Sequence, residues 1–298
     1  MLYPAELRRL RVLLSADGGK RARVYKLARR GESAPFGERG WMLSRRQILA
    51  GAPVACAAPW ALGGCADQGL DQLAHGPAAK VVQARSGDSV ALQTGPPVRL
   101  AGLEAPYGQM EYAPEAQMAL SDLAVGQAVE LLYGGARQDP YGRTLAHLKL
   151  QKSGLWLQRA MLEAGAARVR TYSDNRALAR PMLDAEARAR KAKRGLWDLL
   201  AYRVRLPEEA ALDPYGFQIV EGRVTDVKPT DYGLTIDLEH WVQADIVRSA
   251  QAAFVGASLT ADALRGKLIR VRGQLRRGGG GALITLDHPE QVERLREA

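Results

Sequence analysis

Short segments in which apolar and polar residues alternate predict most of the structure in the middle of the chain. Strands are expected from Lys80 onward and over residues 90–92, 98–100, 128–133 and 144–150. Helices are expected over residues 114–123, 155–164 and 179–194. Pro114 and Glu115 suit the first turn of the first helix, and Gly165 suits the end of the second. Five strands with helices after the third and the fifth predict an OB-type barrel.

The last third of the chain repeats the alternating pattern. Strands are expected over residues 217–226, 233–238, 242–247, 268–276 and 282–286, with a glycine-rich hairpin connection over 278–281. The fold class is therefore β-rich α+β. A five-stranded OB-fold barrel with three helices over residues 80–205 is followed by a second small antiparallel β-barrel-like domain over 206–298, for which an OB-like fold is one candidate.

Charge separates the two expected domains. The chain of 298 residues carries a net charge of +10, which on its own suggests a nucleic-acid-binding protein. Residues 80–205 carry 19 basic and 12 acidic groups, whereas residues 206–298 carry 11 and 14. The basic excess suits phosphate attraction by the first domain. The second domain is expected to be a packing or interaction module.

An export signal is expected near the N-terminus. Ser44-Arg45-Arg46 resembles a twin-arginine signal, and an uncharged stretch follows from Gln47 to Ala66. Within it, Leu62-Gly63-Gly64-Cys65 resembles a lipobox, in which the peptide is cut before the cysteine and Cys65 is lipidated. A buried helix, a membrane span or cleavage elsewhere in the stretch are the alternatives.

These resemblances predict a signal over residues 42–65 and a linker over 66–79. The protein would use the twin-arginine export machinery and be periplasmic, or anchored to the membrane of the cell envelope through a lipid on Cys65. Met42 is a candidate start; otherwise residues 1–41 form an extension without a compact fold. Cys56 and Cys65 both lie in the signal, so no disulfide is expected in the exported part.

Three segments contain the residue types that phosphodiester chemistry needs. They are Ser86-Gly87-Asp88-Ser89, the stretch from Val98 to Pro106 with Arg99, Glu104 and Ala105, and Asp139-Pro140-Tyr141-Gly142-Arg143. Carboxylates can hold a hard cation, and guanidinium groups can hold phosphate oxygens. Taken singly, the arginines could pair with nearby acids, and the acids could belong to turns. The ordered combination predicts a phosphate site.

The third segment also predicts its own geometry. Asp139, Pro140 and Gly142 suit positions i, i+1 and i+3 of a type I turn, which would fix where Arg143 begins the next strand.

In this order, the three segments resemble a staphylococcal-nuclease-type domain over about residues 80–200. The resemblance continues through Thr171-Tyr172-Ser173-Asp174-Asn175 and Gly195-Leu196-Trp197-Asp198. It implies that Ca²⁺ is held by Asp88, Glu104 and the Ala105 carbonyl. It also implies that Arg99 and Arg143 bind the scissile phosphate, that Tyr141 and Tyr172 contact the nucleotide, and that the partner is single- or double-stranded nucleic acid.

The sequence departs from the family pattern at the expected general base. Tyr107 follows Pro106 where the family has a glutamate, and Glu111 is the candidate replacement. Glu104 also stands where an aspartate is usual. Two functions therefore remain open. One is an exported, metal-dependent nuclease that hydrolyses DNA or RNA by in-line attack of water. The other is a catalytically weak or inactive nucleic-acid-binding or envelope scaffold protein. A two-carboxylate glycosidase or a histidine–metal site lacks support.

Overall fold

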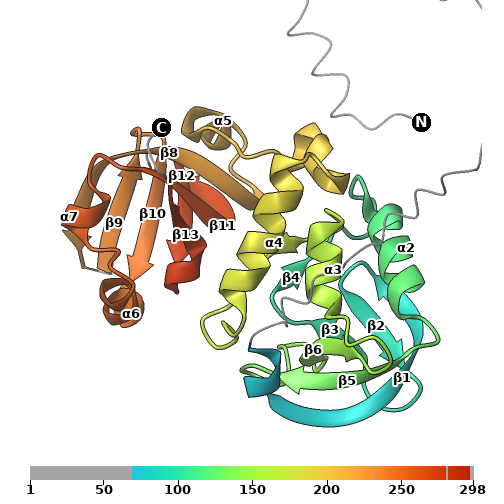
Figure 1. Ribbon diagram of the computed structural model, residues 1–298. Coiled ribbons are helices and arrows are strands. Elements are labelled where there is room, and N and C mark those ends of the chain that lie inside the picture. Colours follow the sequence, from blue (N-terminus) through green and yellow to red (C-terminus); the bar gives the residue numbers. More distant parts are fainter. Residues whose placement is uncertain (1–68, 232, 280, 296–298) are drawn as a thin grey trace, which may run out of the picture. The chain divides into compact units, whose positions relative to one another are not determined.

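The computed structural model describes residues 69–231, 233–279 and 281–295, shown in colour in Figure 1. The expected export signal, Cys65 and residues 1–41 lie outside this range. Both domains described below belong to one compact unit of the chain. Within the described residues, every helix is too short or too polar to cross a membrane.

Five strands of the first domain close into a barrel in the order β1-β2-β3-β6-β5 (Figure 1). The pair β3–β6 is parallel and the other neighbours are antiparallel. This confirms the OB-type barrel predicted from the alternating pattern. The strands are β1 (Ala74–Ser86), β2 (Ser89–Leu92), β3 (Val98–Leu100), β5 (Ala128–Tyr133) and β6 (Thr144–Leu150).

Strand β1 begins before the expected position at Lys80. Its first residues pair with β5, as in Ala74 with Tyr133 and His75 with Leu132. Backbone pairing with a neighbouring strand therefore extends β1 into a segment whose Gly and Pro content favoured a linker.

Three helices accompany the first barrel, as predicted. They are α2 (Ala113–Ala124), α3 (Leu157–Glu163) and α4 (Ala179–Lys191). Leu120 of α2 and Met161 of α3 are fully buried in the hydrophobic core, together with Trp156. Short 3₁₀ helices lie at η1 (Leu70–Gln72), η2 (Gly195–Asp198) and η3 (Leu200–Tyr202).

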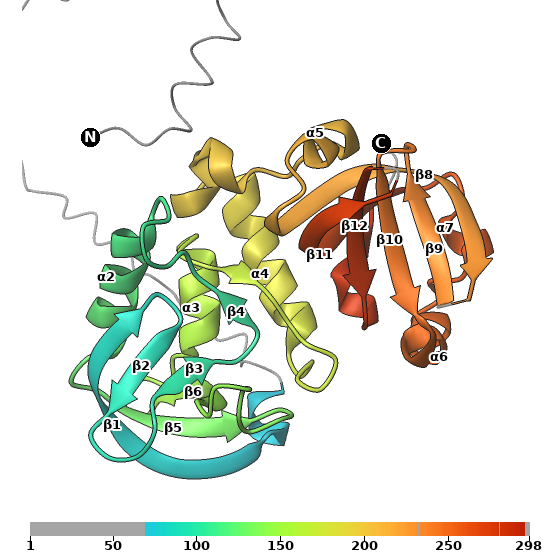
Figure 2. The same ribbon diagram turned by 180° about the vertical axis from the view of Figure 1, so that it is seen from behind.

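A two-stranded ladder that the sequence did not predict lies beside the first barrel. Strand β4 (Leu103–Glu104), labelled in Figure 2, pairs antiparallel with β7 (Arg168–Val169), with Glu104 opposite Arg168. The ladder brings the expected metal-ligand position next to a segment far along the chain.

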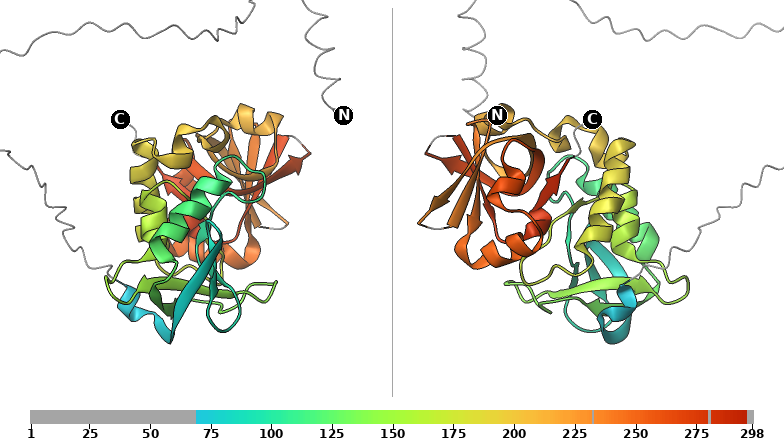
Figure 3. Two further views of the ribbon diagram at one scale, coloured as in Figure 1. Left: turned by 90° about the vertical axis from the view of Figure 1, so that its right-hand side faces the viewer. Right: turned by 60° about the vertical axis from the view of Figure 1, so that its left-hand side comes forward.

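The second domain is a closed sheet with the same strand order. The sheet, coloured orange to red in Figure 3, runs β12-β10-β9-β8-β11-β13, and an additional β12–β11 pairing closes its first five strands into a barrel. The pair β10–β12 is parallel, as β3–β6 is in the first barrel, so the domain is OB-like and not antiparallel throughout. Its strands are β8 (Gly216–Thr230), β9 (Gly233–Leu238), β10 (Val242–Val247), β11 (Leu268–Gly278), β12 (Gly281–Leu286) and β13 (Val292–Arg294).

Short helices connect the strands of the second domain, and its core is separate from that of the first. The core is formed by residues such as Phe254, Ile236 and Ile284. The helices are α5 (Pro207–Leu212), η4 (Arg248–Ala250), α6 (Gln251–Gly256), α7 (Ala261–Leu264) and η5 (Pro289–Gln291).

A buried ion pair joins the second barrel to α4. Arg272 of β11 donates to both carboxylate oxygens of Glu186 at 3.0 and 3.1 Å, and both side chains are buried. The same carboxylate accepts the backbone N–H of Val169 at 2.6 Å. Arg168 also donates to the carbonyl of Phe217 at 3.0 Å. Strand β7 is therefore held between the two barrels.

Candidate functional site

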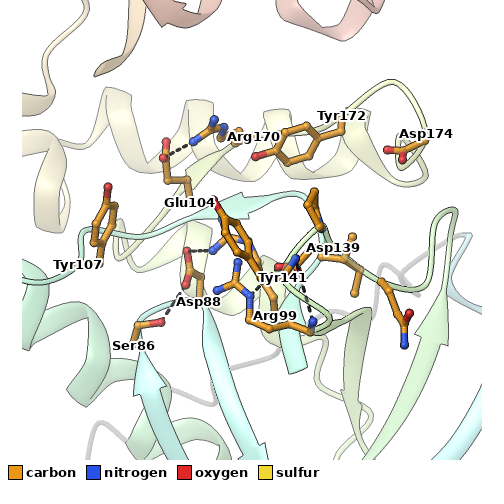
Figure 4. Close-up of a pocket in the computed structure, with 14 residues that line it drawn as sticks. Ser86, Asp88, Arg99, Glu104, Tyr107, Asp139, Tyr141, Arg170, Tyr172 and Asp174 are labelled. Carbon is orange, nitrogen blue, oxygen red and sulfur yellow. Dashed lines mark hydrogen bonds and ion pairs between the residues drawn. The ribbon is translucent and has the colours of Figure 1, made fainter. Parts of the chain in front are cut away.

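Most of the expected site residues line one cleft of about 730 Å³ on the first domain (Figure 4). Asp88, Arg99, Glu104, Tyr141, Arg143 and Tyr172 all contribute to its wall. The complete lining is Ser86, Asp88, Arg99, Glu104, Tyr107, Gln138, Asp139, Pro140, Tyr141, Arg143, Leu145, Arg170, Tyr172 and Asp174.

Asp88 fixes the position of Arg99. Its Oδ2 atom accepts hydrogen bonds from Arg99 Nη1 and from the Ala105 N–H, both at 3.0 Å. Its Oδ1 atom accepts from the Ser86 hydroxyl at 2.9 Å. A Cβ atom at Gly87 would lie 2.7 Å from the side chains of Ala105 and Ala116, so the turn packs this closely only with glycine.

Arg99 is also held from its other side. Its Nη2 atom donates to the Leu103 carbonyl at 3.0 Å, and the side chain is only 15% exposed. Two protein acceptors therefore determine the direction of this guanidinium before any ligand binds.

The turn before β6 fixes Arg143. The N–H of Gly142 donates to the Asp139 carbonyl at 3.0 Å, which confirms the predicted turn. Asp139 Oδ1 accepts the N–H groups of Tyr141 and Arg143, and Oδ2 accepts Arg143 Nε at 2.5 Å. Burial acts to raise the pKa of the Asp139 carboxyl, but these hydrogen bonds hold it below its usual value. Asp139 therefore stays ionised and positions Arg143.

Glu104 lies between two arginines that the sequence analysis did not single out. Its Oε1 atom accepts from Arg170 Nη1 at 2.5 Å, and its Oε2 atom lies 3.6 Å from Arg168 Nη2. The alternation Arg168-Val169-Arg170 was the available signal, because residues two apart on a strand share one face.

Aromatic rings at the cleft are exposed. Tyr141 is 84% exposed, and the Cζ atom of Arg143 lies 5.5 Å from its ring centroid. Tyr172 stands in the same relation to Arg170, also at 5.5 Å. Tyr107 lies on another side of the cleft in Figure 4. Exposed rings beside cations are suited to stacking against nucleobases.

The donor set does not fit the Ca²⁺ ion that the family resemblance implies. Ca²⁺ takes six to eight oxygen ligands. Both oxygens of Asp88 already accept hydrogen bonds, and Glu104 is bonded to Arg170. Ala105 donates its N–H to Asp88, so its backbone carbonyl is the one oxygen that it could offer to an ion. Among the four carboxylate oxygens of Asp88 and Glu104, Glu104 Oε2 is the one that accepts no hydrogen bond in the described part of the chain. Among the described residues, no group of three or more His, Cys, Asp or Glu side chains is arranged to hold a metal.

Glu111 lies outside the cleft lining. Its side chain is exposed, and its backbone carbonyl accepts a hydrogen bond from the Tyr202 hydroxyl at 2.5 Å. Its role as a general base stays a prediction that this placement does not support.

Comparison with known proteins agrees with the geometry of the first domain. Residues 97–199 match the family model described as staphylococcal nuclease homologue. An uncharacterised protein of Bacillus anthracis is 28% identical over 134 residues, which are 41% of this chain and 62% of that protein. The similarity thus spans less than two thirds of that relative. The matched segment is a staphylococcal-nuclease-like domain, and it includes β3, β5 and β6 of the closed five-stranded barrel.

Proposed function

We propose that the nuclease-like domain binds the phosphodiester backbone of a nucleic acid in the cleft described above. The observation that carries this proposal is the convergence of Arg99 and Arg143 on one cleft. Arg99 comes from β3 and Arg143 from the turn before β6, so the barrel brings together two guanidinium groups that are distant in sequence. Guanidinium groups bind phosphate oxygens through charge-assisted hydrogen bonds.

Binding would use arginines whose positions are already fixed. Asp88 and Asp139 each engage part of one guanidinium, and each guanidinium has five N–H donors. The remaining donors can meet phosphate oxygens at little ordering cost. Tyr141 and Tyr172 would stack on the bases that flank the bound phosphate.

Hydrolysis of the bound phosphodiester is the second candidate function. The same two arginines would stabilise the negative charge that builds up on a five-coordinate phosphorus. Tyr107 occupies the place of the family's glutamate, and Glu111 lies outside the cleft lining. Loss of a positioned general base lowers the rate by about 10²–10⁴-fold. We therefore expect any cleavage of DNA or RNA to be slow, and the Ca²⁺ dependence typical of the family lacks support in the donor set.

Incubation of the full chain with single-stranded DNA and RNA, with Ca²⁺ or with a chelator, separates the candidates. Retention of the strand without cutting supports binding, and cutting that Arg143→Ala removes supports hydrolysis. Arg277→Ala is the matched control, because Arg277 is an exposed arginine of the second barrel. Neither retention nor cutting by the unaltered chain would contradict both candidates.

We also propose export by the twin-arginine machinery, with a lipid anchor on Cys65. This proposal rests on Ser44-Arg45-Arg46 and Leu62-Gly63-Gly64-Cys65 in the sequence. Labelling cells with a radioactive fatty acid tests it: the chain should carry label, and Cys65→Ser should not. An unlabelled wild-type chain in the cytoplasmic fraction would contradict it.

A further inference from the structure

We infer that Arg170 is a third phosphate-binding group of the cleft and takes the place of a divalent cation, so that phosphodiester binding needs no metal. This inference rests on the proposed binding function and specifies its chemistry. It starts from the mismatch between the donor set and a Ca²⁺ site.

Arg170 is held in place at the cleft wall. Its Nη1 atom donates to Glu104 at 2.5 Å, and its Cζ atom lies 5.5 Å from the ring centroids of both Tyr172 and Phe217. Figure 4 shows the Arg170 side chain directed toward Glu104, with Tyr172 beside it. The bond to Glu104 uses one of five N–H donors, and the side chain is 26% exposed. Arg170 can therefore hold Glu104 and donate to a phosphate together.

The charges around the cleft balance without an added ion. Three arginines of the lining, Arg99, Arg143 and Arg170, each pair with a carboxylate of the lining. Asp174 adds one further negative charge, and Arg168, buried 3.6 Å from Glu104, adds one further positive charge. The protein groups around the cleft therefore carry no net negative charge, and no added cation is needed before a phosphate can bind.

A divalent ion would have to compete with these fixed pairs. To reach Asp88 it would displace the Ser86 hydroxyl from Oδ1, or Arg99 and the Ala105 N–H from Oδ2, and to reach Glu104 Oε1 it would displace Arg170. Arg168 cannot move away, because it is 5% exposed, donates to the Phe217 carbonyl and lies over the Phe217 ring at 4.9 Å. Two fixed cations beside Glu104 therefore oppose the approach of a third.

The first experiment titrates CaCl₂ alone into the full chain in a calorimeter. We expect no saturable binding to the unaltered chain. In Arg170→Gln, the Glu104 carboxylate loses its closest cation, so Ca²⁺ binding should become measurable. A saturable single-site isotherm for the unaltered chain, lost in Asp88→Asn, would overturn the inference.

The second experiment measures binding of a fluorescent oligothymidylate by anisotropy, with Ca²⁺ or with a chelator. The unaltered chain should bind equally in both, within about twofold. Arg170→Gln should weaken binding in chelator by about tenfold or more, which is the loss expected for one charge-assisted contact. It should also reduce the salt dependence by about one phosphate contact and make binding respond to Ca²⁺.

Arg180→Gln is the matched control, because Arg180 is exposed on α4 outside this cleft, and thermal melts establish that each variant is folded. A Ca²⁺ requirement in the unaltered chain, or unchanged binding by Arg170→Gln, would overturn the inference and leave the proposed function standing. Absence of oligothymidylate binding by the unaltered chain with Ca²⁺ and with chelator would instead overturn the proposed function.

Discussion

The two barrels of this chain share one topology and differ in the residues placed on it. Each has five strands in the same order, with a single parallel pair between the third and the fifth. The third strand of the first barrel carries Arg99, which points into the cleft. The third strand of the second carries Asp245, which accepts a hydrogen bond from Thr235 on the neighbouring strand at 2.6 Å.

The connection between the fourth and fifth strands shows the difference most clearly. In the first barrel a long loop between β5 and β6 contains the turn that fixes Arg143 and presents Tyr141. In the second barrel β11 and β12 are joined by a tight hairpin in which Gly278 pairs with Gly281. Glycine has no side chain, so this hairpin offers no carboxylate that could hold a guanidinium group. The fold thus permits the proposed phosphate site, and the loop residues supply its second arginine.

The second barrel instead supports the first through Arg272, and removing that support should give the largest effect. Burial acts to lower the pKa of Arg272, but Glu186 and Glu293 raise it above its ordinary value, so the group stays charged. Arg272→Met removes a partner that Glu186 and Glu293 share and leaves the buried Glu186 with its ion pair to Arg190, so it should lower the free energy of unfolding by about 3–5 kcal/mol. Urea denaturation measures it.

Arg270→Met is the control for that change, because Arg270 pairs with the partly exposed Glu221 within the second barrel. Its loss should cost about 1 kcal/mol or less. Equal losses in the free energy of unfolding would show that the buried contact between the barrels contributes no more to stability than the Arg270 ion pair does.

Each barrel region also buries one histidine, and the two differ in their partners. His288 is bonded through one ring nitrogen to Thr171 and through the other to Asp287. His147 is fully buried against Trp156, and both of its ring nitrogens lack a partner in the described part of the chain. Burial lowers the pKa of His147 to about 4, compared with about 6.5 in an unfolded chain.

Stability should therefore depend on pH through His147. Between about pH 6.5 and pH 4 the unfolded chain binds a proton there that the folded chain does not, so stability falls as the pH falls. The loss amounts to about 3 kcal/mol at the acid end of this range. Denaturation at a series of pH values measures it, and His147→Leu should show a flatter profile. A slope identical in that variant would contradict the assignment.

Removing Arg143 tests whether single-stranded DNA binds to the first barrel and not to the second. Arg143→Ala should weaken binding of single-stranded DNA by about tenfold to a hundredfold, because a charge-assisted phosphate contact is lost. Arg276→Ala, on the exposed surface of the second barrel, should change it by less than about twofold. Anisotropy titrations give both values, and comparable losses would place nucleic acid on both barrels.

The smallest difference should appear between exposed aromatic residues. Tyr141→Ala should weaken binding by about tenfold through loss of one stacked base. Trp241→Ala, in the second barrel and 50% exposed, should leave the affinity unchanged. The same anisotropy titrations test both variants, and a greater loss of affinity for Trp241→Ala would place the stacking contact on the second barrel.

The strands of both barrels could be predicted because apolar and polar residues alternate along a strand that has one buried face. The predictions over 128–133, 144–150, 233–238 and 242–247 coincide with β5, β6, β9 and β10. The short helices α6 and α7 were not predicted, because six and four residues are too few to show a helical period.

The candidate site could be predicted only where its geometry is local. The turn that fixes Arg143 follows from Asp139, Pro140 and Gly142 within five residues of sequence. Arg170 was missed because it reaches Glu104 through the β4–β7 ladder, which joins segments more than sixty residues apart and is two residues long. The alternation Arg168-Val169-Arg170 is too short a pattern to predict this pairing.

The position of β7 between the barrels limits how this protein can be shortened. A chain cut after residue 205 would keep every residue that lines the cleft, yet Arg168 would lose its Phe217 acceptor and Glu186 would lose Arg272. The smallest unit in which Arg168 and Arg170 keep their present surroundings therefore contains both barrels. A laboratory that expresses the matched family segment alone would be working with a different site.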